Sequence, residues 1–167
     1  MRLPPLAVIV TALASSSLAH MSLAAQSVHQ QNAMRSAVVV PAGSAKFGPA
    51  PAILPTGAKL AVLDGDPMKA ESYTMRLWMP AGYTIPPHFH PLDEHVTVLQ
   101  GTFLVGMGDK IEPTRFVALP VGSFGMLPPG MRHYARARGV TVVQLHGMGP
   151  WSLTYVDPAD NPTSKAR

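Results

Sequence analysis

The stretch GYTIPPHFHPLDEHVTVLQG, residues 82–101, concentrates ionisable side chains in a chain of which only 13% of residues are charged. His88 and His90 are separated by one residue, so they lie on one face of the chain if the segment is extended. The prolines at positions 86 and 87 favour this extended conformation. Two imidazoles on one face can hold a metal ion, whereas two unpartnered imidazoles would leave donors and acceptors unsatisfied.

The strand that follows indicates which neighbouring side chain joins the pair. In EHVTVLQ, residues 94–100, Glu94 shares a face with two valines, and His95 shares the other face with Thr97 and Leu99. Because the valine face is the more apolar, we expect Glu94 to point inward, where a buried carboxylate needs a cation. A β-bulge at Glu94 would reverse this assignment, so His95 is kept as a reserve metal ligand.

A further histidine, His133, occurs in GSFGMLPPGMRHYARAR, residues 122–138. Alternation places it on one face with Ala135 and Ala137, and places Tyr134 and three arginines on the other. We expect the arginine face to be solvated, with an anion or partner site as the alternative. Spacing alone does not bring His133 to the first cluster, and a histidine among alanines is more commonly an ordinary packed residue.

Taken together, the two segments resemble the two sequence motifs of the cupin superfamily. The fixed positions that match are Gly82, His88, His90, Glu94 and Gly101 in the first motif and Gly122, Pro128, Gly130 and His133 in the second. Ala137 stands where the second motif has asparagine. The resemblance spans residues 58–157 and implies one jelly-roll barrel in which His88, His90, Glu94 and His133 bind a single metal ion. The chain also resembles exported single-domain bacterial cupins.

The pattern of the rest of the chain predicts an all-β fold, independently of the two motifs. Short apolar runs end at glycine and proline clusters, and no segment has the periodicity of a three-turn helix. We expect eight or nine strands, at residues 60–63, 72–79, 94–100, 102–108, 115–120, 123–128, 132–138, 140–146 and 152–156. Such a pattern favours a β-sandwich or a jelly-roll barrel.

The flanking segments look different from this barrel. Residues 26–57 are predicted to form an extended arm, anchored by Phe47 and Ile53. Within the arm, AVVV at residues 37–40 is predicted to be a short edge strand that could support a homodimer. Residues 158–167 are predicted to be a frayed polar tail.

The first 25 residues have the layout of a secretory signal peptide. Arg2 precedes an apolar run over residues 6–13 and then a tail of small residues. Cleavage is expected after Ala24 or Ala25, with Ala19 as an alternative, and an uncleaved membrane anchor is the competing interpretation. We therefore expect a periplasmic or secreted protein without stable membrane anchoring. The absence of cysteine fits export and excludes thiolate metal ligands.

Composition also limits the partners. The formal net charge is +4, and the basic residues are not massed over a long stretch, so we expect no nucleic-acid partner.

Other candidate pocket residues are Met79 on one strand and Gln144 with His146 on another. Val143 and Leu145 alternate with Gln144 and His146, so only one of these two pairs can face inward.

Three imidazoles and one carboxylate predict a site for one divalent ion (Fe, Mn, Ni, Zn or Cu) with open coordination positions. A small, anionic ligand could bind there. The favoured function is a metal-dependent oxygenase or related oxidoreductase acting on a small organic acid, enolic or phenolic compound. The alternatives are a non-catalytic periplasmic binding module for metal or small molecules, and a metal-dependent isomerase or decarboxylase.

Overall fold

The structure, a computed structural model, describes residues 36–166. The predicted signal peptide and residues 26–35 of the predicted arm lie outside the described residues. Within the part that is described, no helix is long and apolar enough to cross a membrane. All of the strands belong to one compact unit that begins at Val38.

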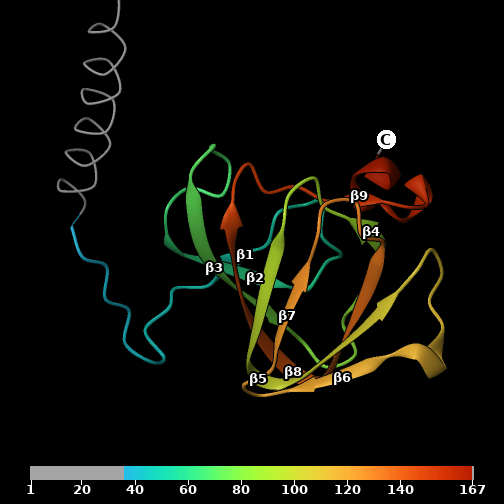
Figure 1. The fold of residues 1–167 in the computed structure, drawn as a ribbon, viewed down its shortest axis with the longest axis horizontal. Helices are drawn as coiled ribbons and strands as arrows, with labels where there is room; N and C mark the ends of the chain where they lie inside the picture. The colour runs from blue at the N-terminus through green and yellow to red at the C-terminus, as the bar shows by residue number, and fades with distance from the viewer. Residues whose placement is uncertain (1–35, 167) are drawn as a thin grey trace, which may run out of the picture. The chain divides into compact units, whose positions relative to one another are not determined.

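The fold of this unit is all-β, as predicted. Its strands form one antiparallel sheet that curls into a half-barrel (Figure 1). The sheet order is β1-β2-β3-β8-β4-β9, with β5 also paired to β8 and with β6 and β7 paired to β5. The strands are β1 (Gly48–Pro49), β2 (Lys59–Asp64), β3 (Ser72–Met79), β4 (Thr84–Phe89), β5 (Glu94–Met107), β6 (Val117–Pro120), β7 (Phe124–Leu127), β8 (His133–Met148) and β9 (Thr154–Tyr155).

Two strands are twice as long as their sequence predicts. Gly101 and Gly139 were expected to end strands, but each lies inside a continuous one, β5 and β8 respectively. Gly101 has φ +73°, and a Cβ atom there would collide with the carbonyl oxygen of Val140. The register between the two strands shifts near Gly101, so the glycine bends β5 instead of ending it.

The arm does not contain the predicted edge strand. Residues 37–40 form no strand, and Val39 is 83% exposed. The residue that anchors the arm most deeply is Leu54, which is buried, whereas Phe47 lies at the surface. The arm joins the sheet later than AVVV, through β1, which pairs with β2.

Two tyrosines of the barrel hold the arm in place. The Tyr83 hydroxyl donates a hydrogen bond to the carbonyl oxygen of Pro55 over 2.6 Å, and the Tyr155 hydroxyl donates one to that of Ile53 over 2.7 Å. Both tyrosine side chains are buried. Residues 53–55 at the end of the arm are therefore tied to the barrel.

The C-terminal tail contains short turns, for which no element was predicted. It forms the 3-10 helices η2 (Pro158–Asp160) and η3 (Pro162–Ala166). The side chain of Asp157 accepts a hydrogen bond from the backbone N–H of Ala159 and so caps η2. Local capping of this kind does not need an apolar pattern, which is why the tail carries little sequence signal.

The core lies on the concave face of the sheet. On β3 the inward set is Met75, Leu77 and Met79, and on β8 it includes Val143 and Leu145. Val96 and Val98 of β5 are buried with them, as strand alternation predicts. The polar residues between these positions face outward.

Candidate metal centre

Four polar side chains are buried together on this concave face. His88 lies in β4, His90 follows it, Glu94 begins β5, and His133 begins β8. Their exposed fractions are only 3%, 5%, 7% and 2% in that order. His88 and His133 are direct partners across the β4–β8 pair, so the sheet itself brings the two distant sequence motifs together.

The four side chains converge at short range. The ligand nitrogens of the three histidines lie within 4.8 Å of one another. The carboxylate of Glu94 faces two of them, with Oε1 3.4 Å from His90 Nε2 and Oε2 3.7 Å from His133 Nε2. His88, His90 and His133 could therefore hold a metal ion, and the Glu94 carboxylate lies beside two of them.

Each imidazole is fixed by its other nitrogen. The Nδ1 atoms of His88, His90 and His133 lie 2.7, 2.7 and 2.9 Å from the carbonyl oxygens of Pro86, Ser152 and Met131. A carbonyl oxygen can only accept, so each Nδ1 carries the proton. In a neutral ring, each Nε2 is then a lone-pair acceptor, as a metal ligand must be.

Burial also favours the neutral form of two of the rings. Burial, together with neighbouring His133 and His90, holds the pKa of His88 well below its usual range. Burial likewise lowers the pKa of His133, although Glu94 and a hydrogen bond to Met131 oppose the shift. Both rings are thus available as neutral ligands near pH 7.

The cluster fits a divalent ion on its own chemistry. The Nε2 atom of His90 is buried and has no hydrogen-bond partner. Its neighbour at 3.4 Å is a carboxylate oxygen, which is also an acceptor. A cation between them would satisfy both atoms, and a nitrogen and oxygen donor set of this kind suits Fe, Mn, Ni, Zn or Cu.

The cluster opens into a narrow apolar cavity. The space available to the centre of a water molecule is about 20 Å³, which accommodates little more than one or two waters. The remaining lining residues are Leu54, Leu77, Ile85, Val96, Phe103, Ala135, Val143, Leu145, Trp151 and Leu153. None of these ten carries an acidic or basic side chain.

Trp151 is a lining residue that the sequence did not single out. Its ring centroid lies 6.0 Å from that of His90, and its Nε1 donor is buried without a hydrogen-bond partner. It follows Pro150 in an irregular segment, so no strand periodicity marked it. The only local feature that sets Trp151 apart in the sequence is the pair Gly149 and Pro150 directly before it.

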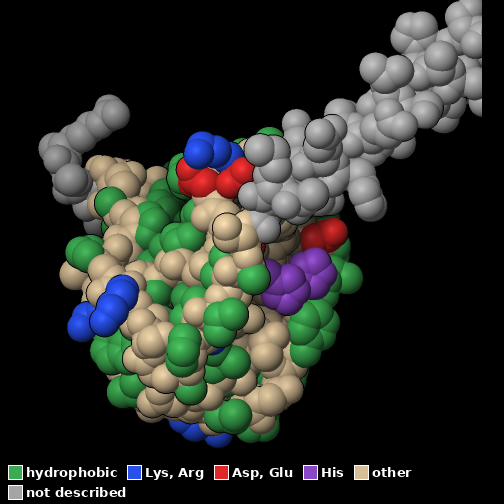
Figure 2. Space-filling model, turned by 90° about the vertical axis from the view of Figure 1, so that its left-hand side faces the viewer, with side chains coloured by type: hydrophobic (Ala, Val, Ile, Leu, Met, Phe, Trp, Pro, Cys, Tyr) green, Lys and Arg blue, Asp and Glu red, His purple; other side chains and the backbone are tan. Residues whose placement is uncertain are grey.

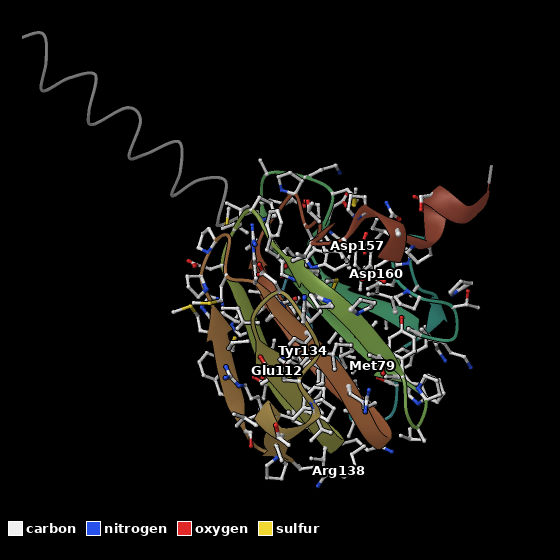
Figure 3. All side chains as sticks on the ribbon, turned by 90° about the vertical axis from the view of Figure 1, so that its right-hand side faces the viewer. Met79, Glu112, Tyr134, Arg138, Asp157 and Asp160 are labelled. Carbon is white, nitrogen blue, oxygen red and sulfur yellow. The ribbon has the colours of Figure 1, made fainter. Side chains whose placement is uncertain are left out.

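The predicted pocket residues lie elsewhere. Met79, which is labelled in Figure 3, is fully buried in the core and is not among the residues that line this cavity. Gln144 and His146 are on the outer face of β8, because Val143 and Leu145 take the inward face. The Gln144 side chain accepts a hydrogen bond from Arg76 there.

His95, the reserve ligand, also lies on the outer face and not in the cluster. Its ring stacks on that of His146, with centroids 4.8 Å apart and planes inclined by 12°. No bulge falls between Glu94 and Val98 in the pairing of β5 with β7 or β8, so strand alternation holds here.

The predicted arginine face of β8 is only partly solvated. Tyr134 is fully buried, and its hydroxyl lies within hydrogen-bonding distance of the backbone N–H and carbonyl of Glu112 (Figure 3). Arg132 pairs with Asp109, and Arg136 donates to the hydroxyl of Thr84. The loop that carries η1 (Pro113–Arg115) covers Tyr134, which spacing could not predict.

Solved structures that are similar to this chain identify its fold. The chain is similar to the polyketide cyclase RemF from Streptomyces resistomycificus, with 16% identity over 78% of this chain and 93% of that chain and a TM-score of 0.63. It is also similar to an acetylacetone dioxygenase from Acinetobacter johnsonii (18%, 76% and 81%, TM-score 0.57). The chain has the cupin fold.

A third neighbour, from Shewanella frigidimarina, is described as an RmlC-like cupin, with 18% identity over 66% of this chain and 89% of that chain and a TM-score of 0.50. No model of a protein family matches the sequence, and no curated protein matches it. At these identities the similarity establishes the cupin fold, and the function has to be argued from the site.

Proposed function

We propose that this protein is an exported, metal-dependent cupin oxygenase or related oxidoreductase that acts on a small organic acid, enolic or phenolic compound. The observation that carries the proposal is the set of three Nδ1-anchored imidazoles whose ligand nitrogens lie within 4.8 Å of one another, with Glu94 facing two of them. His88, His90, Glu94 and His133 would hold one divalent ion. Such an ion would supply Lewis-acid and one-electron chemistry to a small oxygen-donor substrate and dioxygen.

The residues around the cluster support oxidative chemistry over isomerisation. An isomerase or decarboxylase needs a positioned acid or base beside the metal. Apart from the four cluster residues, the lining of this cavity offers none, and the nearest candidates are Tyr73 and Asp93, which line a second hollow that shares His90 and Glu94. The apolar walls exclude water and would orient a small substrate, and the Trp151 N–H is the one other buried donor among the lining side chains.

A non-catalytic binding module is the second candidate. The narrowness of the cavity favours it, because about 20 Å³ leaves little room for a substrate unless the lining residues move. The same four residues would hold the ion in that case, and no substrate would be turned over.

The experiment begins with elemental analysis of the protein purified from periplasm without a histidine tag. About one equivalent of iron, manganese, nickel or copper supports the oxygenase. Oxygen uptake is then measured with β-diketones, keto acids and phenols, using His133→Ala as the inactive control. Redox metal without any turnover across these substrates would favour the binding module. Zinc retained after mismetallation has been ruled out would argue against oxygen chemistry.

Localisation has its own test. Residues 1–25 support export, and the proposal expects the N-terminus of the purified protein to begin after Ala24 or Ala25, or after Ala19. Mass spectrometry of the periplasmic fraction measures this directly. A full-length chain retained in the membrane fraction would contradict it.

A further inference from the structure

A second pair of histidines lies outside the cavity. His95 in β5 and His146 in β8 are direct partners across the strand pair. Of the described histidines these two are the ones that are not buried, so they form the histidine patch on the surface in Figure 2. The proposed oxygenase site uses neither of them.

The geometry brings the two rings together as a unit. Their centroids are 4.8 Å apart and their planes are inclined by only 12°. Phe124 stacks on the other face of the pair, with its centroid 6.0 Å from that of His95. Side chains at directly opposed positions have Cβ atoms only about 5 Å apart, so both imidazoles can reach one ion once a ring turns out of the stack.

Two observations point to a ligand at this pair. The Nδ1 atom of His95 is buried and has no hydrogen-bond partner, which is costly for an imidazole nitrogen. Both rings line a surface hollow of about 350 Å³, together with the backbone or side chains of Asp93, Tyr73 and Thr74. The hollow thus combines imidazole nitrogens with a neighbouring acidic residue and room for water.

We propose that His95 and His146 form a second divalent-metal site, on the outer face of the sheet. Imidazole ligands suit Zn²⁺, Ni²⁺ and Cu²⁺, and the chain contains no cysteine that would compete for them. Asp93 lines the same hollow and is the acidic residue there from which an oxygen ligand would come. Because Glu94 and His95 are consecutive in a strand, they point to opposite faces, so this site is separate from the buried cluster.

The test is equilibrium dialysis of the whole protein against Zn²⁺, with the bound metal per chain measured by elemental analysis. The key variant is His146→Phe, which keeps an aromatic ring against His95 but removes the nitrogen ligands. It is expected to bind about one ion fewer per chain than the wild type, and His95→Asn is expected to do the same. Thr74→Ala, which alters the same hollow without removing a nitrogen, is the matched control.

The result does not depend on the buried cluster. His133→Ala is expected to keep the ion at the outer face, and His146→Phe is expected to keep the ion at the cluster. Equal zinc binding by the wild type, His146→Phe and His95→Asn, with unchanged melting temperatures, would overturn the proposal. If His146→Phe fails to fold, the comparison of His95→Asn with the wild type decides the question.

Discussion

His90 Nε2 and Glu94 Oε1 face each other across 3.4 Å as two buried acceptors. The Nδ1 proton of His90 is committed to the carbonyl oxygen of Ser152, so its Nε2 cannot donate to the carboxylate while the ring is neutral. A contact of this kind is unfavourable in a dry interior without a cation between the two atoms. The contact between a neutral His90 and the Glu94 carboxylate is therefore unfavourable, and a divalent ion bound by both would relieve it.

Glu94→Gln should stabilise the metal-free protein and destabilise the metal-bound protein, each relative to the wild type in the same metal state. The amide of glutamine can donate to His90 Nε2, which adds about 1 kcal/mol for the new hydrogen bond and removes a buried charge. The metal-free variant should thus melt higher than the metal-free wild type. The metal-loaded variant should melt lower than the metal-loaded wild type, because a neutral amide is a weaker ligand.

Calorimetry of chelator-treated and metal-loaded samples measures both differences. At a free metal concentration of about 100 times Kd, binding should stabilise the wild type by about 2.7 kcal/mol. Thr97→Ala, on the outer face of the same strand, is the matched control and should preserve the metal response. A metal-free Glu94→Gln protein that melts below the metal-free wild type would show that the wild-type contact is not strained.

His88→Ala and His133→Ala should each lose most of the metal bound at the cluster while the barrel still folds. Each substitution removes one of the three anchored imidazoles, and the apolar core around them does not depend on the ion. Metal content after dialysis and far-UV circular dichroism measure the two effects. Gln144→Ala, on the outer face of β8, should keep the ion, and full metal retention in both histidine variants would contradict the ligand assignment.

Strand alternation was sufficient to predict the inward position of Glu94. The same rule separated it from His95, because the segment from Glu94 to Val98 is a regular strand. It could not show that His133 joins the cluster, since a pairing between β4 and β8 depends on the whole topology. The resemblance to the cupin motifs supplied that link.

Other features depend on contacts that no local pattern encodes. The carbonyl oxygen that fixes His90 belongs to Ser152, far along the chain. Gly101 looked like the end of a strand, but only the packing of Val140 against it shows that it is a bend. The choice between Gln144 and Val143 for the inward face was open until the register of β8 was known.

Trp151 should report directly on metal binding at the cluster. The chain has two tryptophans, and Trp151 lies against His90, whereas Trp78 contacts Lys59 on the outer side of β3. Paramagnetic ions quench indole fluorescence at short range. With both variants made in the His146→Phe background, Cu²⁺ should therefore quench most of the emission of Trp78→Phe, and it should quench much less in the matched variant Trp151→Phe. Equal quenching in both variants would place the ion away from His90.

The two tyrosines that hold the arm should make the protein sensitive to alkali. Burial raises the pKa of Tyr155 to about 12, with a smaller contribution from Asp160, and burial and Tyr155 raise the pKa of Tyr83 further above its ordinary value of 10. Since both folded values exceed the unfolded one, the stability that the protonated phenols contribute is fully present below pH 10. It is lost as the pH rises from 10 through about 12, when ionisation removes the O–H donors to Ile53 and Pro55.

Urea unfolding at a series of pH values from 8 to 12 measures this loss. Tyr155→Phe removes one hydrogen bond, so it should lower stability at pH 8 by about 1 kcal/mol. The same variant should lose less stability than the wild type between pH 10 and 12, because it has no phenol to ionise at that position. The control is Phe124→Leu, at the surface, which should lose as much stability as the wild type over this pH range. Tyr134→Phe is less suitable because Tyr134 is also buried. A Tyr155→Phe protein whose alkaline loss equals that of the wild type would exclude this anchor as the titrating group.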